Sequence, residues 1–526
     1  VSVSDVEALG TYLVLTFNPA SRLLKGEEAR CAAMKRMVHA LTGAAEAFIY
    51  HPYPVTPYHM DYLHHFDLAE SSKQEHLSRL ANDQGSASQT LKVEAKGQLA
   101  KRLVRPRWRV VKEEGDATLE EIDVGNLVFS HTTDLNGWLG PPWIKEGWFH
   151  AYLLLASTIA DRTAKQAIAS IYQRLVRGDY DGLEEKLNLE RRLTSLLTHS
   201  CERVVVGYTL KREHFNSDFS AGIENIAYDS HTGFNSPLFI RTVKLKDFPW
   251  NGWLRLGVRA GPVAAGNPLG GFTDGAGQLM WFAVGDPAFF PAPYNSSWIP
   301  NRVRATVTAT VREEVPRDAL LPEPGKGFLR EVGGGRTAKT KIVYRVLTSL
   351  FHDGSRMSIA DLLYPYIFAY RWSARRARNG TEYDLAIEGS TALIRERLVG
   401  LKILRIDQEV KDFGGIKVKR EIPVVEVYLE HSSLDPQQVA SMAPPWSSLP
   451  WHLIVLMEEA IKRGLAAFSQ EEATRRGVGW LDLIREERVK ERLASLVKDF
   501  ELQGYVPDPL KGSVTVDEAR QRWAAL

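Results

Sequence analysis

The chain has 526 residues, of which 44% are hydrophobic and 25% are charged, and its formal net charge is +2. This length allows two or three domains with ample hydrophobic core. The near-neutral charge argues against a nucleic-acid-binding protein, which would concentrate lysine and arginine, and the short basic run at 374–378 is predicted to be a solvated helix end.

No stretch approaches the ~20 apolar residues that a membrane span requires. The longest apolar segment, 148–160, contains His150 and is predicted to be a buried helix. No signal peptide is visible at the start of the sequence. Cys31 and Cys201 leave two interpretations open, a disulfide or two small buried side chains, and they form no metal-binding Cys-x-x-Cys pattern.

The first region, 1–145, is predicted to mix strands and helices. Residues 8–18 read as a strand and residues 25–41 as a helix, because apolar side chains recur on one face. The proline-rich segment 50–58 must be irregular. The polar segment 71–92 is predicted to be a mobile loop or an exposed helix.

The segment 51–67 is rich in histidine and suggests a metal site. If residues 60–67 are helical, Asp61 shares a face with His64 and His65, a spacing that can hold Zn²⁺ or another borderline metal, and His59 lies close by in sequence. The alternative is that these imidazoles pack among aromatic rings and bond to backbone carbonyls. The metal candidates are therefore His59, Asp61, His64 and His65, and the sequence leaves the cofactor unknown.

The second region, 146–315, is predicted to contain helices over 148–177 and 183–199 and then a β-rich, aromatic part. Aromatic faces flanked by amides and carboxylates suit recognition of peptides, sugars or cations. The alternative is a β-rich core. The candidate ligand-binding residues are Trp250, Trp253, Asp274, Trp281, Tyr294, Asn295 and Trp298.

Other constellations in this region predict less. The glycine-rich segment 270–277 lacks the phosphate-binding patterns and reads as a turn. Glu224, Asp229 and Asp274 could supply the two carboxyl groups of a glycoside hydrolase, although solvated loop acids are the usual explanation. No catalytic residue is assigned.

A linker is predicted over 316–340, which is rich in proline and glycine, and it precedes a last region over 341–526. Residues 341–351 read as a strand, and the Asp353–Gly354 pair predicts a sharp turn. Ser358 and Asp361 have the spacing of a helix cap, and the helix that follows contains Pro365, which predicts a kink.

This succession of strand, Phe-His-Asp-Gly turn and capped helix resembles the extracellular solute-binding proteins of family 5, the oligopeptide, dipeptide and nickel type. The segments 398–410 and 423–429 resemble the hairpin that follows in that family. The resemblance covers about a tenth of the chain. It departs from the family because about 340 residues precede the motif, and no ligand-binding position of the family can be placed on this sequence.

The resemblance implies an α/β fold with mixed sheets and periplasmic-binding-protein-like lobes, to which helical and β-rich regions are added. It also implies a periplasmic or extracellular receptor that captures a small molecule or peptide for the permease of an ABC transporter. The alternative is an accessory subunit on the same fold that docks a redox or membrane partner. A metal-dependent or glycoside hydrolase is the third interpretation.

Overall fold

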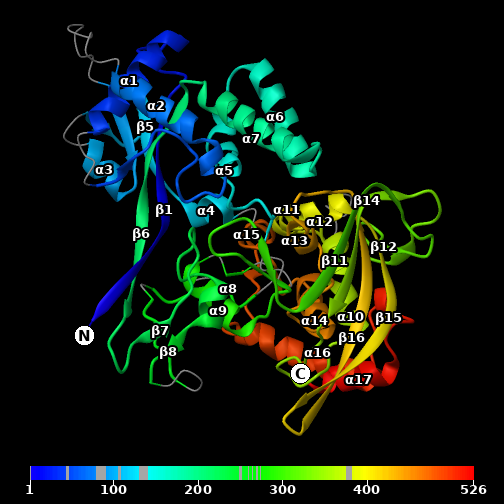
Figure 1. Cartoon of the computed structure of the whole chain (residues 1–526). Helices are drawn as coiled ribbons and strands as arrows, with labels where there is room; N and C mark the ends of the chain where they lie inside the picture. The colour runs from blue at the N-terminus through cyan, green and yellow to red at the C-terminus, as the bar shows by residue number, and fades with distance from the viewer. Residues whose placement is uncertain are drawn as a thin grey trace. The chain divides into compact units, whose positions relative to one another are not determined.

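The computed structural model describes residues 2–42, 47–78, 91–104, 108–129, 140–247, 252–258, 260–262, 265–267, 271–272, 274–374 and 382–526. Contacts divide the chain into two compact units (Figure 1). Unit 1 comprises Val1–Phe129, Trp143–Leu254 and Ala292–Ser296, and unit 2 comprises Ser130–Pro142, Arg255–Pro291 and Ser297–Leu526.

Unit 1 is built on a six-stranded sheet in the order β2-β6-β1-β5-β3-β4. β1 pairs antiparallel with both β6 and β5, whereas β3 pairs parallel with β5 and β4, so the sheet is mixed. The strands are β1 (Val3–Phe17), β2 (Ile49–Tyr50), β3 (Lys92–Lys96), β4 (Arg109–Val111), β5 (Ala117–Asp123) and β6 (Arg203–Asn216).

The two faces of β1 are both buried. Leu13, Leu15 and Phe17 alternate along the strand and share one hydrophobic cluster with side chains of α1 (Glu27–Thr42) and α3 (Gln98–Val104). Tyr12 has the opposite parity and is fully buried away from that cluster. The predicted helix over 25–41 is confirmed.

Further helices of unit 1 follow β2, β5 and β7. They are α2 (Phe66–Ser78), α4 (Val124–Phe129), α5 (Gly147–Leu155), α6 (Arg162–Arg177), α7 (Gly182–Thr198) and α8 (Pro237–Thr242), with the short helices η1 (Tyr62–His64) and η3 (Ala156–Thr158) and the strand pair β7 (Ile223–Asn225) and β8 (Lys244–Leu245). The helix predicted over 148–177 is two helices, because Asp161 caps a new helix by accepting a hydrogen bond from the N–H of Ala164 at 2.6 Å.

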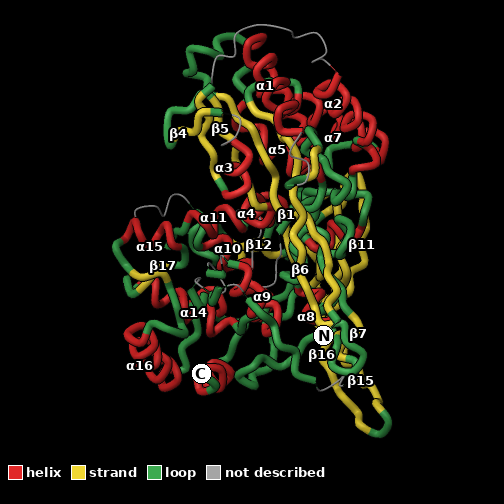
Figure 2. Tube along the Cα trace, turned by 90° about the vertical axis from the view of Figure 1, so that its left-hand side faces the viewer, coloured by secondary structure: helices red, strands yellow, loops and turns green. Residues whose placement is uncertain are grey.

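Unit 2 is built on a second six-stranded sheet in the order β11-β14-β16-β15-β12-β13, in which all the pairs are antiparallel. Its strands are β11 (Val303–Glu314), β12 (Leu320–Pro322), β13 (Leu329–Glu331), β14 (Thr337–Val346), β15 (Leu398–Phe413) and β16 (Ile416–Leu429). The hairpin predicted over 398–410 and 423–429 is confirmed as β15 and β16, which Figure 2 shows as a long two-stranded ribbon. The segment 316–340, predicted as a linker, instead supplies β12, β13 and the start of β14, because its glycines and most of its prolines fall in the turns between short strands.

Helices and short strands complete unit 2. They are β9 (Phe289–Pro291), β10 (Trp298–Pro300), β17 (Ala466–Ala467), β18 (Gly479–Trp480), α9 (Gly275–Val284), α10 (Ile359–Arg371), α11 (Leu385–Ser390), α12 (Ala392–Arg397), α13 (Pro436–Ser441), α14 (Trp451–Lys462), α15 (Gln470–Arg476), α16 (Glu487–Gln503), η5 (Asp508–Leu510) and α17 (Val516–Ala524). α10 is buried along most of its length, including Pro365.

The predicted class, α/β with mixed sheets, is confirmed. The predicted domain boundaries at residues 145, 315 and 340 do not coincide with those of the two compact units. Unit 1 is assembled from three separate stretches of chain, which a division into consecutive regions does not describe. Within the described residues, no helix combines the length and the apolarity that crossing a bilayer demands.

Candidate functional site

The strand–turn–helix element that carries the family resemblance lies in unit 2. β14 ends at Val346, and a single antiparallel bridge between Leu350 and Arg356 closes the turn that follows. Gly354 has a φ of +82°, which a residue with a Cβ adopts only under strain. Asp353 tightens the turn, because its Oδ1 accepts hydrogen bonds from the N–H of Ser355 at 2.8 Å and from its hydroxyl at 2.7 Å. The predicted strand therefore stops five residues early, and the predicted turn is confirmed.

Asp361 connects the start of α10 to two other elements. Its Oδ2 accepts a hydrogen bond from the N–H of Ser358 at 2.7 Å and completes a capping box. Its Oδ1 accepts from the N–H of Trp451, the first residue of α14, at 2.8 Å. Burial raises the pKa of this carboxyl, although Arg522 and these N–H donors act in the opposite direction. The predicted cap is confirmed.

Arg522 of α17 holds the turn from the other side. Its Nη1 donates to the hydroxyl of Ser355 at 2.9 Å, and its Nη2 donates to Asp361 Oδ2 at 2.7 Å and to the carbonyl oxygen of Arg356. His452 of α14 lies 3.1 Å from Asp353 Oδ2. Two distant helices thus fix the backbone of the turn.

A pocket of about 640 Å³ opens beside this turn, within the size range of small-molecule sites. The turn supplies the guanidinium of Arg356, which is exposed, and β16 supplies the exposed carboxylate of Glu421. The pocket therefore offers both signs of charge to a ligand. Its lining residues are Asp353, Gly354, Ser355, Arg356, Met357, Ser358, Ile359, Ile406, Glu421, Pro423, Ser513, Glu518, Gln521, Arg522 and Ala525.

Some of the predicted ligand-binding aromatic and amide residues belong to unit 1. Trp253 is 90% exposed and Tyr294 is 64% exposed, and Asn295 is also exposed. The ring of Tyr294 packs edge-on against Tyr228, with ring centroids 6.2 Å apart. These side chains are accessible to a ligand. Trp250 lies outside the described residues.

The other predicted ligand-binding residues belong to unit 2 and have structural roles. Asp274 caps α9, since its carboxylate accepts a hydrogen bond from the N–H of Gly277 at 2.9 Å. Trp281 is buried and stacks on Phe272, and Trp298 is buried in β10. The seven residues therefore divide between the two units, and the prediction that they form one ligand site stays a prediction.

The predicted metal candidates separate into two groups. His59 faces His150 and His231, whereas Asp61 and His65 face Glu190, and His64 is exposed. Asp61 does not share a helical face with His64, because residues 62–64 form only the short helix η1, and its carboxylate instead accepts from the N–H groups of Gly147 and Trp148 at 2.7 and 3.0 Å.

The sequence pattern did not identify His150, His231 and Glu190 as members of these groups. They lie about 80 to 165 residues beyond the end of the segment 51–67, so local spacing could not join them to it. The one available signal was His150, a polar residue inside the otherwise apolar segment that became α5.

The predicted carboxylates of a glycoside hydrolase also have separate surroundings. Asp229 is buried and forms an ion pair with Lys145, and its Oδ1 accepts from the N–H groups of His231 and Thr232. Glu224 is exposed on β7, and Asp274 caps α9. The three carboxylates therefore belong to three different elements and are not adjacent in sequence.

No family model matches the chain, and no curated protein matches it. One solved structure that is similar in part is the oligopeptide-binding protein AppA from Bacillus subtilis, in complex with a nonapeptide, at 9% sequence identity and a TM-score of 0.27. The similarity covers 44% of this chain and 51% of that chain, so the match spans about half the length of that structure. A likeness this distant carries no argument about function.

Proposed function

We propose that this chain is a solute-binding receptor that captures a small zwitterionic molecule, such as a short peptide, without covalent chemistry. The observation that supports the proposal is the pocket of about 640 Å³ between the turn of the strand–turn–helix element that resembles family 5 receptors, the hairpin of β15 and β16, and α17. A peptide carries a carboxylate at one end and an ammonium at the other. Arg356 offers the carboxylate a positively charged partner, and Glu421 offers the ammonium a negatively charged one.

The proposed mechanism is a shift between conformations. A ligand that binds one conformation more tightly increases its population, and that conformation is then presented to the permease of an ABC transporter. The disulfide between Cys31 and Cys201 supports a periplasmic or extracellular location, because disulfides persist in oxidising compartments.

Binding to the pocket can be tested by calorimetric titration of the full chain with a mixed library of short peptides, after native mass spectrometry has identified any co-purified ligand. We expect the double variant Arg356→Ala/Glu421→Ala to weaken binding at least tenfold, because both charged partners of the ligand are removed. Phe413→Ser is the matched control, since Phe413 is exposed on the same hairpin as Glu421 and does not line the pocket. Binding that is unchanged in the double variant would overturn the pocket assignment.

A second variant tests the aromatic residues predicted from sequence. Trp253→Phe should leave the affinity for peptides unchanged if the pocket is the site. If Trp253→Phe weakens binding tenfold and the double variant does not, the ligand binds at the exposed aromatic side chains of unit 1. Wild-type protein that binds no peptide, amino acid or sugar would overturn the receptor proposal itself.

A further inference from the structure

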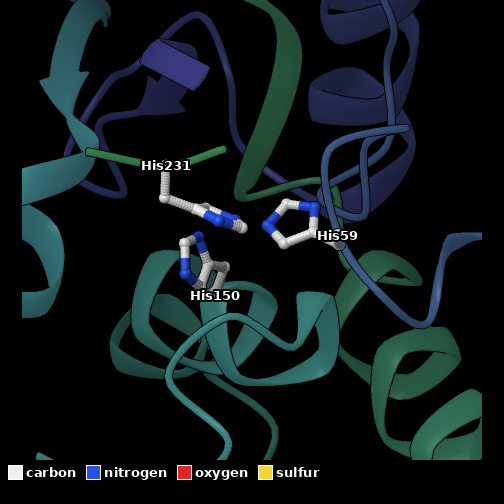
Figure 3. A group of neighbouring side chains, drawn as sticks. All are labelled: His59, His150 and His231. Carbon is white, nitrogen blue, oxygen red and sulfur yellow. The ribbon is translucent and has the colours of Figure 1, made fainter. Parts of the chain in front are cut away.

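Three buried histidines from separate parts of unit 1 face one another (Figure 3). His59 comes from the loop after β2, His150 from α5, and His231 from the turn over 229–233. One ligand nitrogen of each ring lies within 4.8 Å of those of the other two. The ring centroids are 4.7 Å apart for His59 and His150, 5.2 Å for His59 and His231, and 5.3 Å for His150 and His231.

Each of these rings is oriented through one nitrogen by its own local chain. His150 Nε2 lies 2.9 Å from the carbonyl oxygen of Ile144, and His231 Nδ1 lies 3.2 Å from the hydroxyl of Ser230. His59 Nδ1 accepts a hydrogen bond from the N–H of Thr56 at 2.9 Å, and it also lies 3.1 Å from the hydroxyl and 3.3 Å from the carbonyl oxygen of Thr56. Metal-binding histidines donate their second N–H to an oxygen, so a metal ion on His59 Nε2 requires the proton to move to Nδ1, which then donates to one of the two Thr56 oxygens.

The remaining nitrogens meet at the centre of the cluster. The hydroxyl of Tyr12, from the face of β1 opposite the hydrophobic cluster, lies 3.0 Å from both His59 Nε2 and His150 Nδ1. Among the described residues, His231 Nε2 is buried and has no hydrogen-bonding partner. A buried polar atom without a partner destabilises a fold, and an ion held between the three imidazoles would supply the missing partner of His231 Nε2.

We propose that His59, His150 and His231 bind one divalent transition-metal ion, of the class that includes Zn²⁺, Co²⁺ and Cu²⁺. Imidazole is a preferred ligand of these ions, and three protein ligands with a fourth position open is an established arrangement for Zn²⁺. A tetrahedral ion with metal–nitrogen distances of ~2.0–2.1 Å places its ligand nitrogens about 3.4 Å apart. Side-chain rotations that draw the rings together by about an ångström complete the site, with the Tyr12 hydroxyl displaced to the fourth position.

The second group of potential ligands in unit 1, Asp61, His65 and Glu190, is less suited to a cation. The ammonium of Lys186 already lies 2.5 Å from Glu190 Oε1 and 3.4 Å from Glu146 Oε2. This positive charge already compensates the carboxylate of Glu190 and would repel a metal ion. We therefore assign the metal to the three histidines alone. The assignment does not depend on the proposed solute binding, because the pocket belongs to unit 2.

The site can be tested with Co²⁺, whose visible absorption reports its coordination. The full chain is treated with a chelator, dialysed and titrated with Co²⁺ and then with Zn²⁺ as competitor. We expect one equivalent of Co²⁺ to bind with the intense visible bands of a tetrahedral site, and Zn²⁺ to displace it. His231→Ala should weaken Co²⁺ binding by about 100-fold or more, beyond the 10–100-fold that follows loss of a residue that only orients a ligand.

Two control variants make the titration specific. His76→Ala removes another buried histidine of unit 1 and should leave Co²⁺ binding unchanged. His65→Ala removes a member of the second group and should also leave it unchanged. The assignment is overturned if the wild-type chain shows no Co²⁺ bands, if His231→Ala binds as the wild type does, or if His65→Ala abolishes binding.

One measurement needs no variant and remains decisive if His231→Ala does not fold. X-ray absorption of the Zn²⁺-loaded wild-type chain should show the multiple scattering of about three imidazole ligands. A first shell dominated by carboxylate oxygen would overturn the assignment, because it would place the ion at Asp61 and Glu190.

Discussion

Arg522 is a single side chain on which the turn over 351–358 depends. It is 4% exposed, and its guanidinium bonds to Ser355, Asp361 and the carbonyl oxygen of Arg356. Asp361 is fully buried. When one partner of a buried ion pair is removed, the other charge stays in a poorly solvating environment without compensation.

We therefore expect Arg522→Met to lower the free energy of unfolding by about 3–5 kcal/mol, since it leaves the Asp361 carboxylate unpaired. Arg520→Met is the matched control on the same helix, because Arg520 pairs with Asp517 at the surface and such pairs contribute about 0–1 kcal/mol. Urea unfolding followed by tryptophan fluorescence measures both. Equal midpoints for the two variants would contradict the role assigned to Arg522.

The sequence predicted one half of this arrangement. Ser358 and Asp361 are three residues apart, and local hydrogen-bond geometry suffices to predict that they form a cap. Arg522 follows Asp361 by 161 residues, and many other arginines of the chain could have filled its place. The histidines of the proposed metal site pose the same difficulty, since each is separated from the next by 80 residues or more. The spacing of residues along the sequence predicts hydrogen bonds between near neighbours. It does not predict which distant residue completes the interaction.

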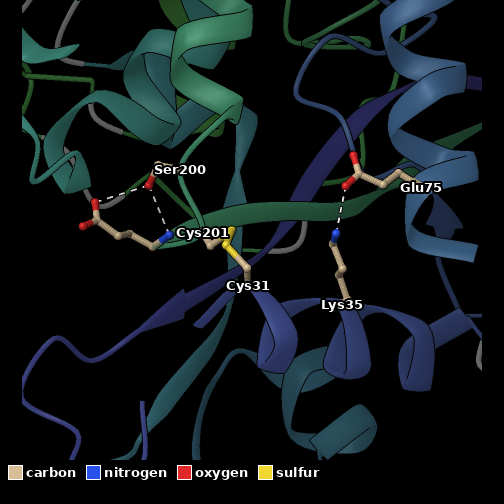
Figure 4. The surroundings of a disulfide bond; sticks show 6 residues. Cys31, Lys35, Glu75, Ser200 and Cys201 are labelled. Carbon is tan, nitrogen blue, oxygen red and sulfur yellow. Dashed lines mark hydrogen bonds and ion pairs between the residues drawn. A yellow bond between two sulfur atoms is a disulfide. The ribbon is translucent and has the colours of Figure 1, made fainter. Parts of the chain in front are cut away.

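At the scale of elements, one covalent bond ties α1 to the start of β6. Cys31 lies in α1 and Cys201 lies two residues before β6, and the disulfide between them closes a loop of 170 residues (Figure 4). Figure 4 also shows Lys35, one turn further along α1, which pairs with Glu75 of α2 at 2.8 Å. α1 is thus held by a covalent bond and by a partly exposed ion pair.

The double variant Cys31→Ala/Cys201→Ala should lower the free energy of unfolding by about 2–5 kcal/mol, because the unfolded chain gains the conformations that the cross-link forbids. Lys35→Met is the matched control and should change it by about 0–1 kcal/mol. Urea unfolding with and without a reducing agent measures both effects. If reduction leaves the wild-type midpoint unchanged, the disulfide does not stabilise unit 1.

A buried carboxylate joins α10 to α14 in unit 2. Glu458 of α14 accepts hydrogen bonds from Arg371 at 3.2 Å, from the indole of Trp372 at 2.5 Å and from the hydroxyl of Tyr364. Glu458→Gln should destabilise the protein by about 3–5 kcal/mol, because it leaves the Arg371 guanidinium buried without a counter-charge.

The neighbouring variant Glu459→Gln is the control for Glu458→Gln. Glu459 pairs with Lys462 and Arg463, whose side chains are 27% and 54% exposed, and its loss should cost about 0–1 kcal/mol. Thermal unfolding monitored by far-ultraviolet circular dichroism compares the two. A larger shift for Glu459→Gln than for Glu458→Gln would contradict the importance given to the buried carboxylate.

Element types were more predictable than element boundaries. Apolar periodicity predicted the helix that became α1, because one face of it packs on a core, and the resemblance to family 5 receptors predicted the hairpin of β15 and β16. The sequence predicted a single helix through residues 156–161. In the structure α5 ends at Leu155, and Asp161 caps the next helix, α6. Over 316–340, proline and glycine predicted a linker, yet the turns that they form separate short strands of one sheet.

The course of the chain through the whole molecule was the least predictable feature. β1 pairs with β6 along most of its length although about 200 residues separate them, and residues 292–296 return to unit 1 after the chain has entered unit 2. The chain length predicted more than one domain, since it constrains how much core can form, and the resemblance to family 5 receptors predicted the α/β class. Neither indicates which distant strands pair.

Buried neutral histidines occur in both units and make the stability of the whole molecule depend on pH. Burial lowers the pKa of His65, His150 and His452 to about 4 and that of His431 to about 3. In the unfolded chain these groups titrate near 6.5. The unfolded state therefore binds more protons between pH 6.5 and 4, so the stability that the neutral histidines confer is complete above pH 6.5 and is lost as the pH falls through this window.

Carboxyl groups oppose part of this effect. Burial raises the pKa values of Asp61, Asp361 and Asp384, so the native state takes up protons at these groups before the unfolded state does, and acidification favours folding through them. The net dependence of the free energy of unfolding on pH is thus the difference between the contribution of the buried histidines and that of the buried carboxyl groups. A single histidine can be isolated from this balance by a variant that cannot be protonated.

His431→Gln should flatten the dependence of the free energy of unfolding on pH between 6.5 and 4. One proton taken up only by the unfolded state lowers the free energy of unfolding by about 1.4 kcal/mol per pH unit. Between pH 6.5 and pH 5 the wild type therefore loses about 2 kcal/mol through His431, and the variant does not. His352→Gln is the matched control in unit 2, because His352 is exposed. Urea midpoints measured in the presence of a chelator from pH 7.5 to 4.5 give the three slopes. Parallel curves for the wild type and His431→Gln would show that His431 is not held neutral by burial, since no other change in the variant alters the number of protons bound.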